Sequence, residues 1–487
     1  MRTAELHRAA AAVVMPGFVG TELPDWVLSR LDAGMAGVWL FGHNVVDPDQ
    51  VGALTAQLHL RAPHALVASD EEGGTVTRLE QREGSRWPGH AALGRVDDID
   101  LTQQVAAELG AFAASCGVDL VAAPDADVNS APGNPVIGVR AFGADPTVVS
   151  RHTAAFVRGL AQGGVLSCAK HFPGHGATTQ DSHIDLPRVE DTREVVRGRD
   201  LPPFAAAVEA GVDVLMTGHV VYDAWAATPA TITPELICLA REDLGFTGVV
   251  CTDALDMAAI DAVVGRHQGA VLALAAGVDL VCLGNPAFPR DYDAKADVDS
   301  VVQAVMTAVT RGELSAERLQ QAAARVLALG QRQASRRVLA DGPQRDAPVG
   351  ARAADAALDV LGVVPRAWHD PLVHVPDGGT NIASGTRAAA FLRELALGWP
   401  GLRVAGEPAV AEGHGGDLVV VTDDRTDPLA AEPMVRRAAV LVHLGISDPP
   451  AATPSGCVVV RTWGGGRAAA HAVAAALSPD AAAKENV

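Results

Sequence analysis

The alternation of short apolar runs with helix-length amphipathic segments is the feature that most constrains the fold of this chain. Eight such runs, rich in β-branched residues, occur up to residue 283. They are Ala12 to Met15, Gly37 to Phe41, Ala65 to Ser69, Val118 to Ala122, Val165 to Ala169, Val212 to Thr217, Gly248 to Thr252 and Val278 to Leu283. Alternation of this kind builds parallel sheet from βα units. Eight units predict a closed (β/α)8 TIM barrel over residues 1–335.

The residues after the eighth run predict a second, smaller domain. Residues 336–350 lie in a stretch rich in Arg, Asp, Pro and Gly, which is typical of a linker. Over residues 351–480 the alternation restarts, with strand-like runs at Val360 to Val364, Leu418 to Thr422, Val440 to Leu444 and Val458 to Arg461. With helical segments between them, these runs predict an open α/β layer domain. Residues 481–487 are expected to be a disordered tail.

Composition and charge exclude several classes of function. The 487 residues are 48% hydrophobic and 20% charged, as expected of a globular chain with a sizeable core. The net charge of −20 argues against a nucleic-acid partner, because no basic field attracts phosphates. No apolar run approaches the ~20 residues of a membrane helix. We interpret Ala9 to Met15 as a first strand and not as a signal peptide, which predicts a cytoplasmic chain.

Cysteine and isolated histidine residues point to packing and not to chemistry. The six cysteines are scattered, and most lie in or beside apolar strand-like runs. We interpret them as buried free thiols and not as a disulfide framework or a metal-ligand pair. His64, His90, His152 and His267 are expected on the surface or with satisfied hydrogen bonds in the core.

Polar residues concentrate directly after the predicted strands. They are Phe41 to Asn44, Asp70 to Gly74, Pro124 and Asp125, Lys170 and His171, Gly218 and His219, Asp253, and Gly284 and Asn285. The carboxyl ends of the strands form the catalytic rim of a (β/α)8 barrel. Helix capping explains part of this set, and Asp253 to Asp256 resembles a cap. Capping does not explain Lys170 and His171, or the paired acids before Gly73 and Gly74.

The segment from Lys170 to His183 carries the strongest chemical signal. It combines a lysine, three histidines and an aspartate with Pro173 and two glycines, which favour a rigid irregular backbone. Asp181 and His183 lie two residues apart on this loop. At that spacing the carboxylate can hold one ring nitrogen of the histidine, and the other nitrogen is left to transfer a proton near neutral pH.

Asp253 follows an apolar strand and is expected to stand in the barrel mouth, where a rigid element holds it. That placement suits a nucleophile. A carboxylate that attacks, paired with an acid that protonates the leaving group, is the logic of a retaining glycosidase. Most such enzymes use a second carboxylic acid in that role, so an Asp-His pair is the unusual element.

With these residues in view, the chain resembles glycoside hydrolase family 3, and within it the β-N-acetylglucosaminidases related to bacterial cell-wall recycling enzymes. The resemblance runs through the whole barrel and rests on six motifs in order. They are Gly37 to Gly42, Asp70 to Arg78, Asn134 to Arg140, Lys170 to His183, Leu201 to Phe204 and Thr252 to Leu255. The loop that ends at His183 separates this branch from the family's glucosidases. Thr75 departs from the larger polar residue that relatives often carry.

The resemblance implies roles for individual residues. Asp253 would be the nucleophile that forms a covalent glycosyl intermediate, His183 the acid/base, and Asp181 its orienting partner. The sugar's hydroxyls and acetamido group would be held by a further set of side chains: Asp70, Arg78, Arg140, Lys170 and His171. The expected substrate is a small amino-sugar glycoside, and no cofactor is implied. The leaving group, gluco against galacto preference and the oligomeric state stay open.

Three alternatives remain at this point. A histidine acid/base repels an anionic acceptor less than a carboxylate does, so inorganic phosphate could replace water and yield a sugar 1-phosphate. A zinc-dependent barrel hydrolase is the second alternative, because His171, His175, Asp181 and His183 offer metal ligands. The third is a catalytically silent sugar-binding module that keeps the pocket without the chemistry.

Overall fold

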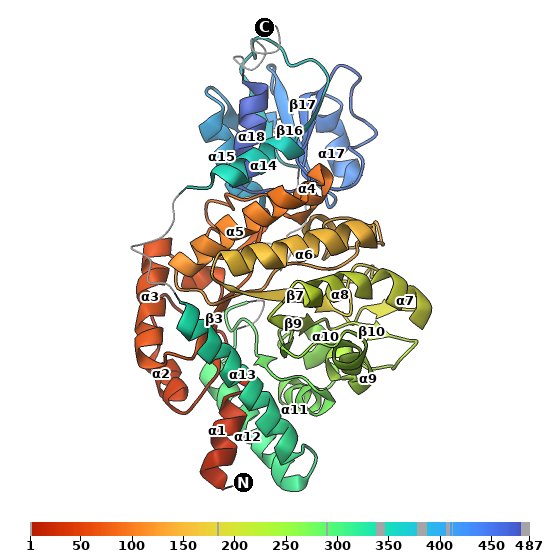
Figure 1. The fold of residues 1–487 in the computed structure, drawn as a ribbon. Helices are drawn as coiled ribbons and strands as arrows, with labels where there is room; N and C mark the ends of the chain where they lie inside the picture. The colour runs from red at the N-terminus through yellow and green to blue at the C-terminus, as the bar shows by residue number, and fades with distance from the viewer. Residues whose placement is uncertain are drawn as a thin grey trace.

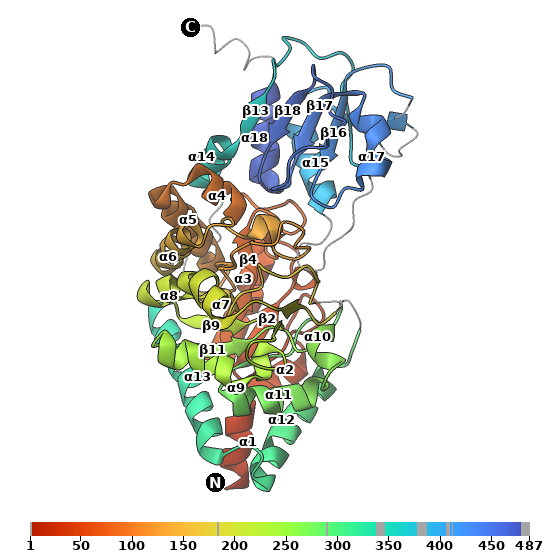
Figure 2. The same cartoon turned by 90° about the vertical axis from the view of Figure 1, so that its right-hand side faces the viewer.

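The chain folds into a larger α/β part and a smaller one stacked end to end (Figures 1 and 2). The computed structural model describes residues 2–182, 185–288, 291–337, 346–376, 387–405, 410–411 and 413–478. Helix α1 (Thr3–Ala11) lies at the far end of the larger part, and the last described helix, α18 (Arg467–Leu477), belongs to the smaller part. Both parts have the α/β layering that the alternating sequence predicts.

The larger part is a closed barrel of eight parallel strands. They are β1 (Val14–Met15), β2 (Gly37–Leu40), β3 (Leu66–Ser69), β6 (Leu120–Val121), β7 (Leu166–Phe172), β9 (Val214–Thr217), β11 (Val249–Thr252) and β12 (Val281–Cys282). Six pair in the order β11-β9-β7-β6-β3-β2, and β1 pairs with β12. Backbone hydrogen bonds from Ala36 N to Val14 O (3.3 Å) and from Thr252 N to Leu280 O (3.0 Å) join the two groups. The predicted (β/α)8 barrel is therefore confirmed.

Helices alternate with the barrel strands in sequence, beginning with α1 before β1, and cover the outside of the sheet. They are α1 (Thr3–Ala11), α2 (Asp25–Asp32), α3 (Pro48–Arg61), α4 (His90–Val96), α5 (Ile99–Ser115), α6 (Pro146–Gln162), α7 (Arg193–Arg199), α8 (Leu201–Glu209), α9 (Pro234–Cys238), α10 (Ala258–Asp261), α11 (Arg266–Ala276), α12 (Ala294–Arg311) and α13 (Ala316–Arg336). Helix α1 corrects the sequence interpretation, because Ala9 to Ala11 are helical and the first strand begins only at Val14.

Alternating side chains divide the barrel core into two layers. Val38 and Val67 point toward the helices and join the large cluster between sheet and helices. Their neighbours Trp39, Leu66 and Ala68 point into the barrel, where Met15, Met216 and the thiols of Cys168, Cys251 and Cys282 join them. Successive side chains of a strand face opposite sides, so each apolar run supplies both layers. This double burial explains why the runs are continuously apolar.

The smaller part contains a six-stranded sheet in the order β13-β18-β17-β16-β14-β15. The strands are β13 (Asp359–Leu361), β14 (Leu372–His374), β15 (Arg403–Val404), β16 (Leu418–Thr422), β17 (Ala438–His443) and β18 (Val458–Arg461). All pairs are parallel except β13 with β18. Helices α15 (Arg387–Gly398) and α18 (Arg467–Leu477) cover one face, and α17 (Pro428–Val435) covers the other. The predicted open α/β layer is confirmed, although β14, β15 and α17 were not predicted.

Helix α14 (Pro348–Ala357) lies where the two parts meet and contacts both (Figure 1). The first turn of α14 is tied to the barrel, because Glu108 of α5 accepts hydrogen bonds from Val349 N (3.1 Å) and Gly350 N (3.2 Å). The boundaries at 335 and 351 and the linker between them stay predictions. Most of that linker, residues 338–345, and the predicted tail at 481–487 lie outside the described residues.

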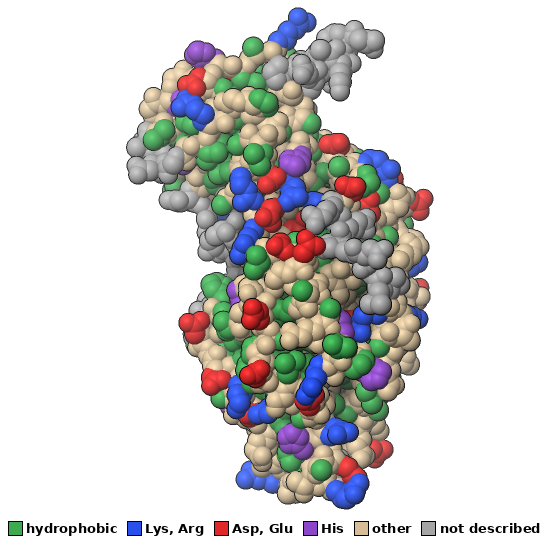
Figure 3. All heavy atoms as spheres, turned by 90° about the vertical axis from the view of Figure 1, so that its left-hand side faces the viewer, with side chains coloured by type: hydrophobic (Ala, Val, Ile, Leu, Met, Phe, Trp, Pro, Cys, Tyr) green, Lys and Arg blue, Asp and Glu red, His purple; other side chains and the backbone are tan. Residues whose placement is uncertain are grey.

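The cysteines are free, and five of the six are buried, whereas Cys238 at the end of α9 is exposed. His90 corrects a second expectation. It is fully buried, and neither ring nitrogen has a hydrogen-bond partner among the residues described. In that same part of the chain no helix is long and apolar enough to cross a membrane. Figure 3 shows basic side chains scattered among acidic ones over one long face, without a basic patch.

Candidate active site

The carboxyl ends of four barrel strands carry the charged side chains of the candidate site. Asp70 follows β3, Asp125 follows β6, Lys170 and His171 lie at the end of β7, and Asp253 follows β11. In the order of strands around the barrel, β3 and β11 are diametrically opposite. Asp253 therefore stands across the barrel mouth from Asp70, while Lys170 and His171 lie between them on one side.

Lys170 joins two carboxylates that come from the same strand end. Its Nζ lies 2.7 Å from Asp70 Oδ1 and 2.7 Å from Glu72 Oε1, and its side chain is only 3% exposed. Arg78 holds the other oxygen of Asp70 through Nη2 at 3.1 Å. Burial alone would raise the pKa of Asp70, but the charges of Lys170 and Arg78 hold that pKa below its ordinary value. Asp70 is therefore an ionised acceptor.

Glu72 continues this network to Arg140. The guanidinium of Arg140 makes a two-pronged contact with Glu72, from Nε to Oε2 at 3.0 Å and from Nη2 to Oε1 at 2.8 Å. Both side chains are buried, which strengthens the paired geometry. Although burial acts against the charged form, the charges of Arg140 and Lys170 hold the pKa of Glu72 well below its ordinary value. Glu72 thus neutralises the charges of Lys170 and Arg140 and orients both side chains.

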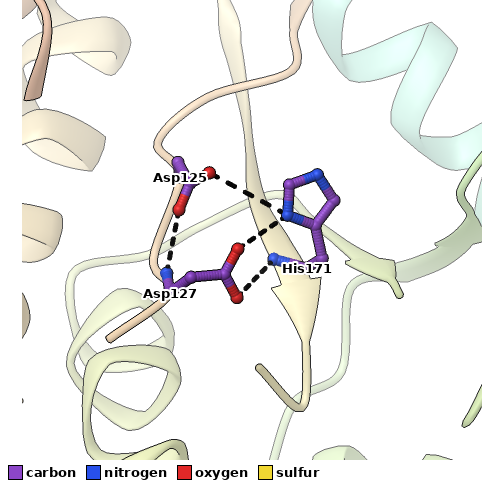
Figure 4. Close-up of side chains that lie close together, drawn as sticks. All are labelled: Asp125, Asp127 and His171. Atoms are coloured by element: carbon purple, nitrogen blue, oxygen red, sulfur yellow. Dashed lines mark hydrogen bonds and ion pairs between the residues drawn. The ribbon is translucent and has the colours of Figure 1, made fainter. Parts of the chain in front are cut away.

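Asp127 holds the other end of the network through His171 (Figure 4). His171 Nδ1 lies 2.7 Å from Asp127 Oδ2, and Asp127 Oδ1 accepts from the backbone nitrogens of His175 (2.6 Å) and His171 (3.3 Å). Arg140 Nη2, which is always a donor, lies 3.4 Å from His171 Nε2. The two contacts together assign the proton to Nδ1 of His171 and leave Nε2 as an acceptor.

Asp125 and Asp127 differ in charge although only one residue separates them. Asp125 Oδ1 accepts from Asp127 N (3.0 Å), while its Oδ2 has no hydrogen-bond partner among the described residues. Burial and the charge of Asp127 raise the pKa of Asp125 well above its ordinary value. Burial also acts to raise the pKa of Asp127, but His171 and His175 hold it below its ordinary value. We therefore assign Asp125 as the neutral acid and Asp127 as the carboxylate.

A short hairpin after β3 positions Arg78. Its strands are β4 (Glu71–Gly73) and β5 (Val76–Thr77), and Glu71 ties them together. The Glu71 carboxyl accepts from Thr77 Oγ1 (2.6 Å) and from the backbone nitrogens of Arg78 and Leu79 (each 2.8 Å). Burial raises the pKa of Glu71 to about 7 despite these bonds. The motif before Gly73 and Gly74 thus contributes one structural acid, Glu71, and one site acid, Glu72.

The loop after β7 is packed tightly against the barrel rim. Gly174 has a φ of +146°, and a Cβ there would lie 2.9 Å from the side chain of Asp200, so glycine is required. Asn134 donates to His175 O (2.9 Å) and fixes the neighbouring rim loop to this one. The ring of His175 is held by Thr178 Oγ1 (2.8 Å) and Ser182 Oγ (3.0 Å), and burial lowers its pKa to about 4. His175 is thus a neutral structural residue.

The predicted acid/base pair is only partly described. Asp181 is half-buried on the loop, and its backbone oxygen accepts from Asp185 N (2.9 Å). His183 lies outside the described residues, so the pairing of its ring with Asp181 stays a prediction.

Asp253 is half-buried at the end of β11, where its Oδ1 accepts from Ala254 N (2.7 Å). Asp256 instead accepts from Asn285 N (2.8 Å), and burial raises its pKa to about 7. Burial and the charges of Asp253 and Asp256 raise the pKa of the Cys282 thiol in the barrel interior, and Asp70 also contributes. Carboxylates from both sides of the barrel mouth therefore disfavour the thiolate form of Cys282.

The comparison with family models decides the family. The model of the glycosyl hydrolase family 3 N-terminal domain matches residues 22–329, which span the barrel from before α2 into α13. This chain belongs to glycoside hydrolase family 3. The family prediction is confirmed, and the chain is a glycoside hydrolase.

Similar proteins carry closely related names. A β-hexosaminidase from Chromobacterium violaceum is 39% identical over 298 residues, which are 59% of this chain and 82% of that protein. β-Hexosaminidase A from Pseudoalteromonas piscicida is 34% identical over 349 residues, which are 66% of this chain but only 56% of that protein. A solved family 3 β-N-acetylglucosaminidase from Paenibacillus sp. FPU-7 superposes with a TM-score of 0.85 at 28% identity, covering 97% of this chain and 96% of that one. The last match includes both parts of the fold.

The structure brings five of the eight predicted site residues of this family 3 chain into one connected network. These five are Asp70, Arg78, Arg140, Lys170 and His171. Sequence reasoning did not select Glu72 and Asp127, which link them. Glu72 was noticed only as part of a double acid. Asp127 stands two residues beyond the predicted strand-end residue Asp125, and that spacing was the available signal.

The carboxylates and imidazole of Asp125, Asp127 and His171 also form a group whose ligand atoms lie within 4.8 Å of one another. The surrounding chemistry does not fit a cation. His171 Nδ1 carries the proton of its bond to Asp127, and the Arg140 guanidinium lies 3.5 Å from Asp125 Oδ2 as a fixed positive charge. Arg140 and the proton between His171 and Asp127 already supply the positive charge that a metal ion would bring.

Proposed function

We propose that this glycoside hydrolase is a retaining β-N-acetylhexosaminidase that removes terminal β-linked N-acetylglucosamine. The observation that carries the proposal is the buried network of Asp70, Lys170, Glu72 and Arg140 on one side of the mouth, with Asp253 on the opposite strand end. The two-domain likeness to a β-N-acetylglucosaminidase supports the choice of an amino sugar. An ionised acceptor beside fixed donors is the arrangement that a neutral, hydroxyl-rich ring requires.

Asp253 acts as the nucleophile in this proposal. Its carboxylate attacks the anomeric carbon, the bond to the leaving oxygen breaks, and a covalent glycosyl ester forms. The hydrogen bond from Ala254 N to Oδ1 holds the side chain at the end of the rigid strand β11, where a nucleophile is required. Water then attacks the same carbon from the other face, the ester bond breaks to release the Asp253 carboxylate, and the product keeps the β configuration.

His183 and Asp181 act as the acid/base pair. His183 donates a proton to the leaving oxygen in the first step and takes one from water in the second, while Asp181 orients the ring. The packed neighbours of this loop support the assignment. His175 is buried and held by Thr178 and Ser182, so it does not compete with His183 for the proton-transfer role.

The network residues hold the sugar. Asp70 accepts from ring hydroxyls, and Lys170 and Arg78 donate to hydroxyl oxygens on the same edge of the sugar. His171 presents an acceptor at Nε2, because Asp127 fixes its proton on Nδ1. Arg140 is anchored by Glu72 and positions both His171 and the loop from Val136, whose oxygen accepts from Arg140 Nη1 (3.3 Å).

A side-by-side assay tests the proposal. Chromogenic β-N-acetylglucosaminide, β-N-acetylgalactosaminide and β-glucoside are compared at equal concentration, and products are identified in phosphate and in phosphate-free buffer. We expect preferred turnover of the first substrate and release of free N-acetylglucosamine. Equal or greater turnover of the glucoside would reject the amino-sugar assignment. Accumulation of N-acetylglucosamine 1-phosphate would make phosphate the acceptor in place of water.

Two further attributes belong to this proposal. A cytoplasmic location and a role in peptidoglycan recycling rest on the resemblance to bacterial cell-wall recycling enzymes. They are tested by the fraction in which the native protein is found and by its action on fragments of cell wall.

A further inference from the structure

Two loops at the barrel rim and three loops of the second sheet line a pocket of ≈ 150 Å³. The barrel contributes Thr75 and the loop around Asn134 and Gly138, while the second sheet contributes residues after β16, β17 and β18. Apolar groups such as Val139, Leu444 and Ile446 form part of the wall. The pocket is therefore built by both parts of the fold and has room for a small ring.

Arg425, from the loop after β16, is the basic side chain among the lining residues. Its Nη2 donates to the backbone oxygen of Pro135 on the barrel rim. Among the residues that the structure describes, this is the one hydrogen bond of the Arg425 side chain, and the side chain forms no ion pair with them. A half-buried guanidinium has five N–H donors, so most of its donors remain available to a ligand.

The two acidic neighbours of Arg425 are engaged elsewhere. Asp423 accepts from the backbone nitrogen of Arg425 (2.9 Å) and from Thr426 Oγ1 (3.3 Å), which shapes the turn. Asp424 accepts from Ile446 N (2.9 Å) and Ser447 N (2.9 Å) and fixes the loop after β17. Both carboxylates therefore fix the loops that line the pocket, and Arg425 supplies the cationic side chain.

Arg425 also lies close to the proposed acid/base loop. Burial lowers the pKa of Arg425, while the charges of Asp423 and Asp181 raise it. The barrel loop that Arg425 contacts at Pro135 also contacts the acid/base loop, because Asn134 donates to His175 O (2.9 Å). In a retaining mechanism the acid/base residue protonates the leaving oxygen, which places the leaving group on this side.

We propose that this pocket binds a carboxylate carried by the leaving group of the substrate, and that Arg425 is the side chain that receives it. The planar guanidinium matches a carboxylate with two parallel N–H bonds, and the apolar wall holds the ring or chain that bears it. Arg425 is then a specificity-determining residue supplied by the second domain. The inference rests on the proposed hexosaminidase activity.

Two matched substrates test the inference on the full chain. They are the 3-carboxy-4-nitrophenyl and 3-carboxamido-4-nitrophenyl β-N-acetylglucosaminides, which differ in charge at one position. The quantity measured is the ratio of kcat/KM for the carboxylate to kcat/KM for the carboxamide. Arg425→Gln removes the charge but keeps an N–H donor for Pro135 O, and Arg425→Lys keeps the charge without the planar geometry. Arg436→Gln, at an exposed arginine paired with Glu432, is the matched control.

We expect the wild-type ratio to exceed the Arg425→Gln ratio by about tenfold, the size of one charge-assisted hydrogen bond. Arg425→Lys should keep an intermediate ratio, and Arg436→Gln the full one. A wild-type ratio that Arg425→Gln leaves unchanged would overturn the inference while the activity stands. If neither substrate is turned over, the proposed function itself fails. A purely structural role would lower both kcat/KM values together and leave the ratio constant.

Discussion

Asp127 and His171 form a 2.7 Å hydrogen bond at the edge of the sugar network, and this bond sets the proton on Nδ1 of the imidazole. Asp127→Asn replaces the acceptor by an amide whose N–H faces Nδ1. The proton then moves to Nε2, where it meets the Arg140 donor at 3.4 Å. We expect kcat/KM to fall on the order of 10²-fold, because the network residues lose their alignment. Steady-state kinetics and 15N NMR of the imidazole measure the two effects.

Asp125→Asn is the matched control for this substitution. The amide resembles the neutral acid that we assign to Asp125, so its effect on kcat/KM should be much smaller. Equal losses in the two variants would contradict the assignment of charge within the pair. An Nδ1–H tautomer that persists in Asp127→Asn would contradict the proposed cause.

Lys170 neutralises two carboxylates at once, and its removal is expected to affect stability as well as activity. Lys170→Met leaves Asp70 held by Arg78 alone and Glu72 held by Arg140 alone. Breaking a buried ion pair costs about 3–5 kcal/mol of unfolding free energy. Denaturant unfolding should show a loss of this order, and turnover of the amino-sugar substrate should fall.

Lys295 provides the comparison, because it is half exposed and pairs with Asp299 within the same helix. Lys295→Met should change the unfolding free energy by less than about 1 kcal/mol. A Lys170→Met variant as stable as Lys295→Met would show that the network is not a buried ion-pair system.

The sequence predicted the barrel because its signal is local. Each strand such as β2 or β11 is buried on both faces, so it appears as an uninterrupted apolar run that ends at a polar residue. The smaller sheet was predicted less completely. Strands β14 and β15 have three and two residues, too few for a period to be recognised, and Pro433 lies inside α17.

The candidate site likewise contains residues that could be predicted from the sequence and contacts that could not. Strand-end residues such as Asp70, Lys170 and Asp253 could be selected, since a strand end is recognised from the run that precedes it. The links between strands could not. Glu72 meets Arg140 across 68 residues of sequence, and Arg425 meets Pro135 across 290, so only the folded chain shows these pairs. His90 was misjudged because its apolar surroundings, Phe142 and Phe156, come from later segments.

His90 makes acid stability a testable property. Burial lowers its pKa to about 3, whereas an unfolded histidine titrates near 6.5. As the pH falls below about 6.5, the unfolded state takes up a proton that the folded state refuses until about pH 3. Stability present at neutral pH is therefore lost on acidification. His90→Leu should reduce the loss of unfolding free energy between pH 8 and pH 5 by roughly 2 kcal/mol.

Denaturant unfolding at both pH values gives this difference directly. His175, whose pKa burial lowers to about 4, continues to contribute in the variant, so the pH dependence should weaken and not disappear. If the unfolding free energy of wild type and of His90→Leu fell equally between pH 8 and pH 5, the assignment of a lowered pKa to His90 would be contradicted.

Metal removal separates the glycosidase from the zinc alternative. Arg140 already provides positive charge beside Asp125, and the Nδ1 proton of His171 occupies the contact with Asp127. We therefore expect full hydrolytic activity after exhaustive chelation and dialysis. Loss of activity that added zinc restores would support a metal-dependent reaction and contradict the proposed mechanism.

The central claim is that Asp253 becomes covalently bound to the sugar, and intact-protein mass after reaction with a 5-fluoro-N-acetylglucosaminyl inactivator tests it most directly. Peptide mapping locates any adduct, and Asp253→Ala serves as the control. We predict one added glycosyl unit on Asp253, and loss of both adduct and turnover in Asp253→Ala. An adduct on another residue, or an Asp253→Ala variant that still turns over substrate, would contradict the account.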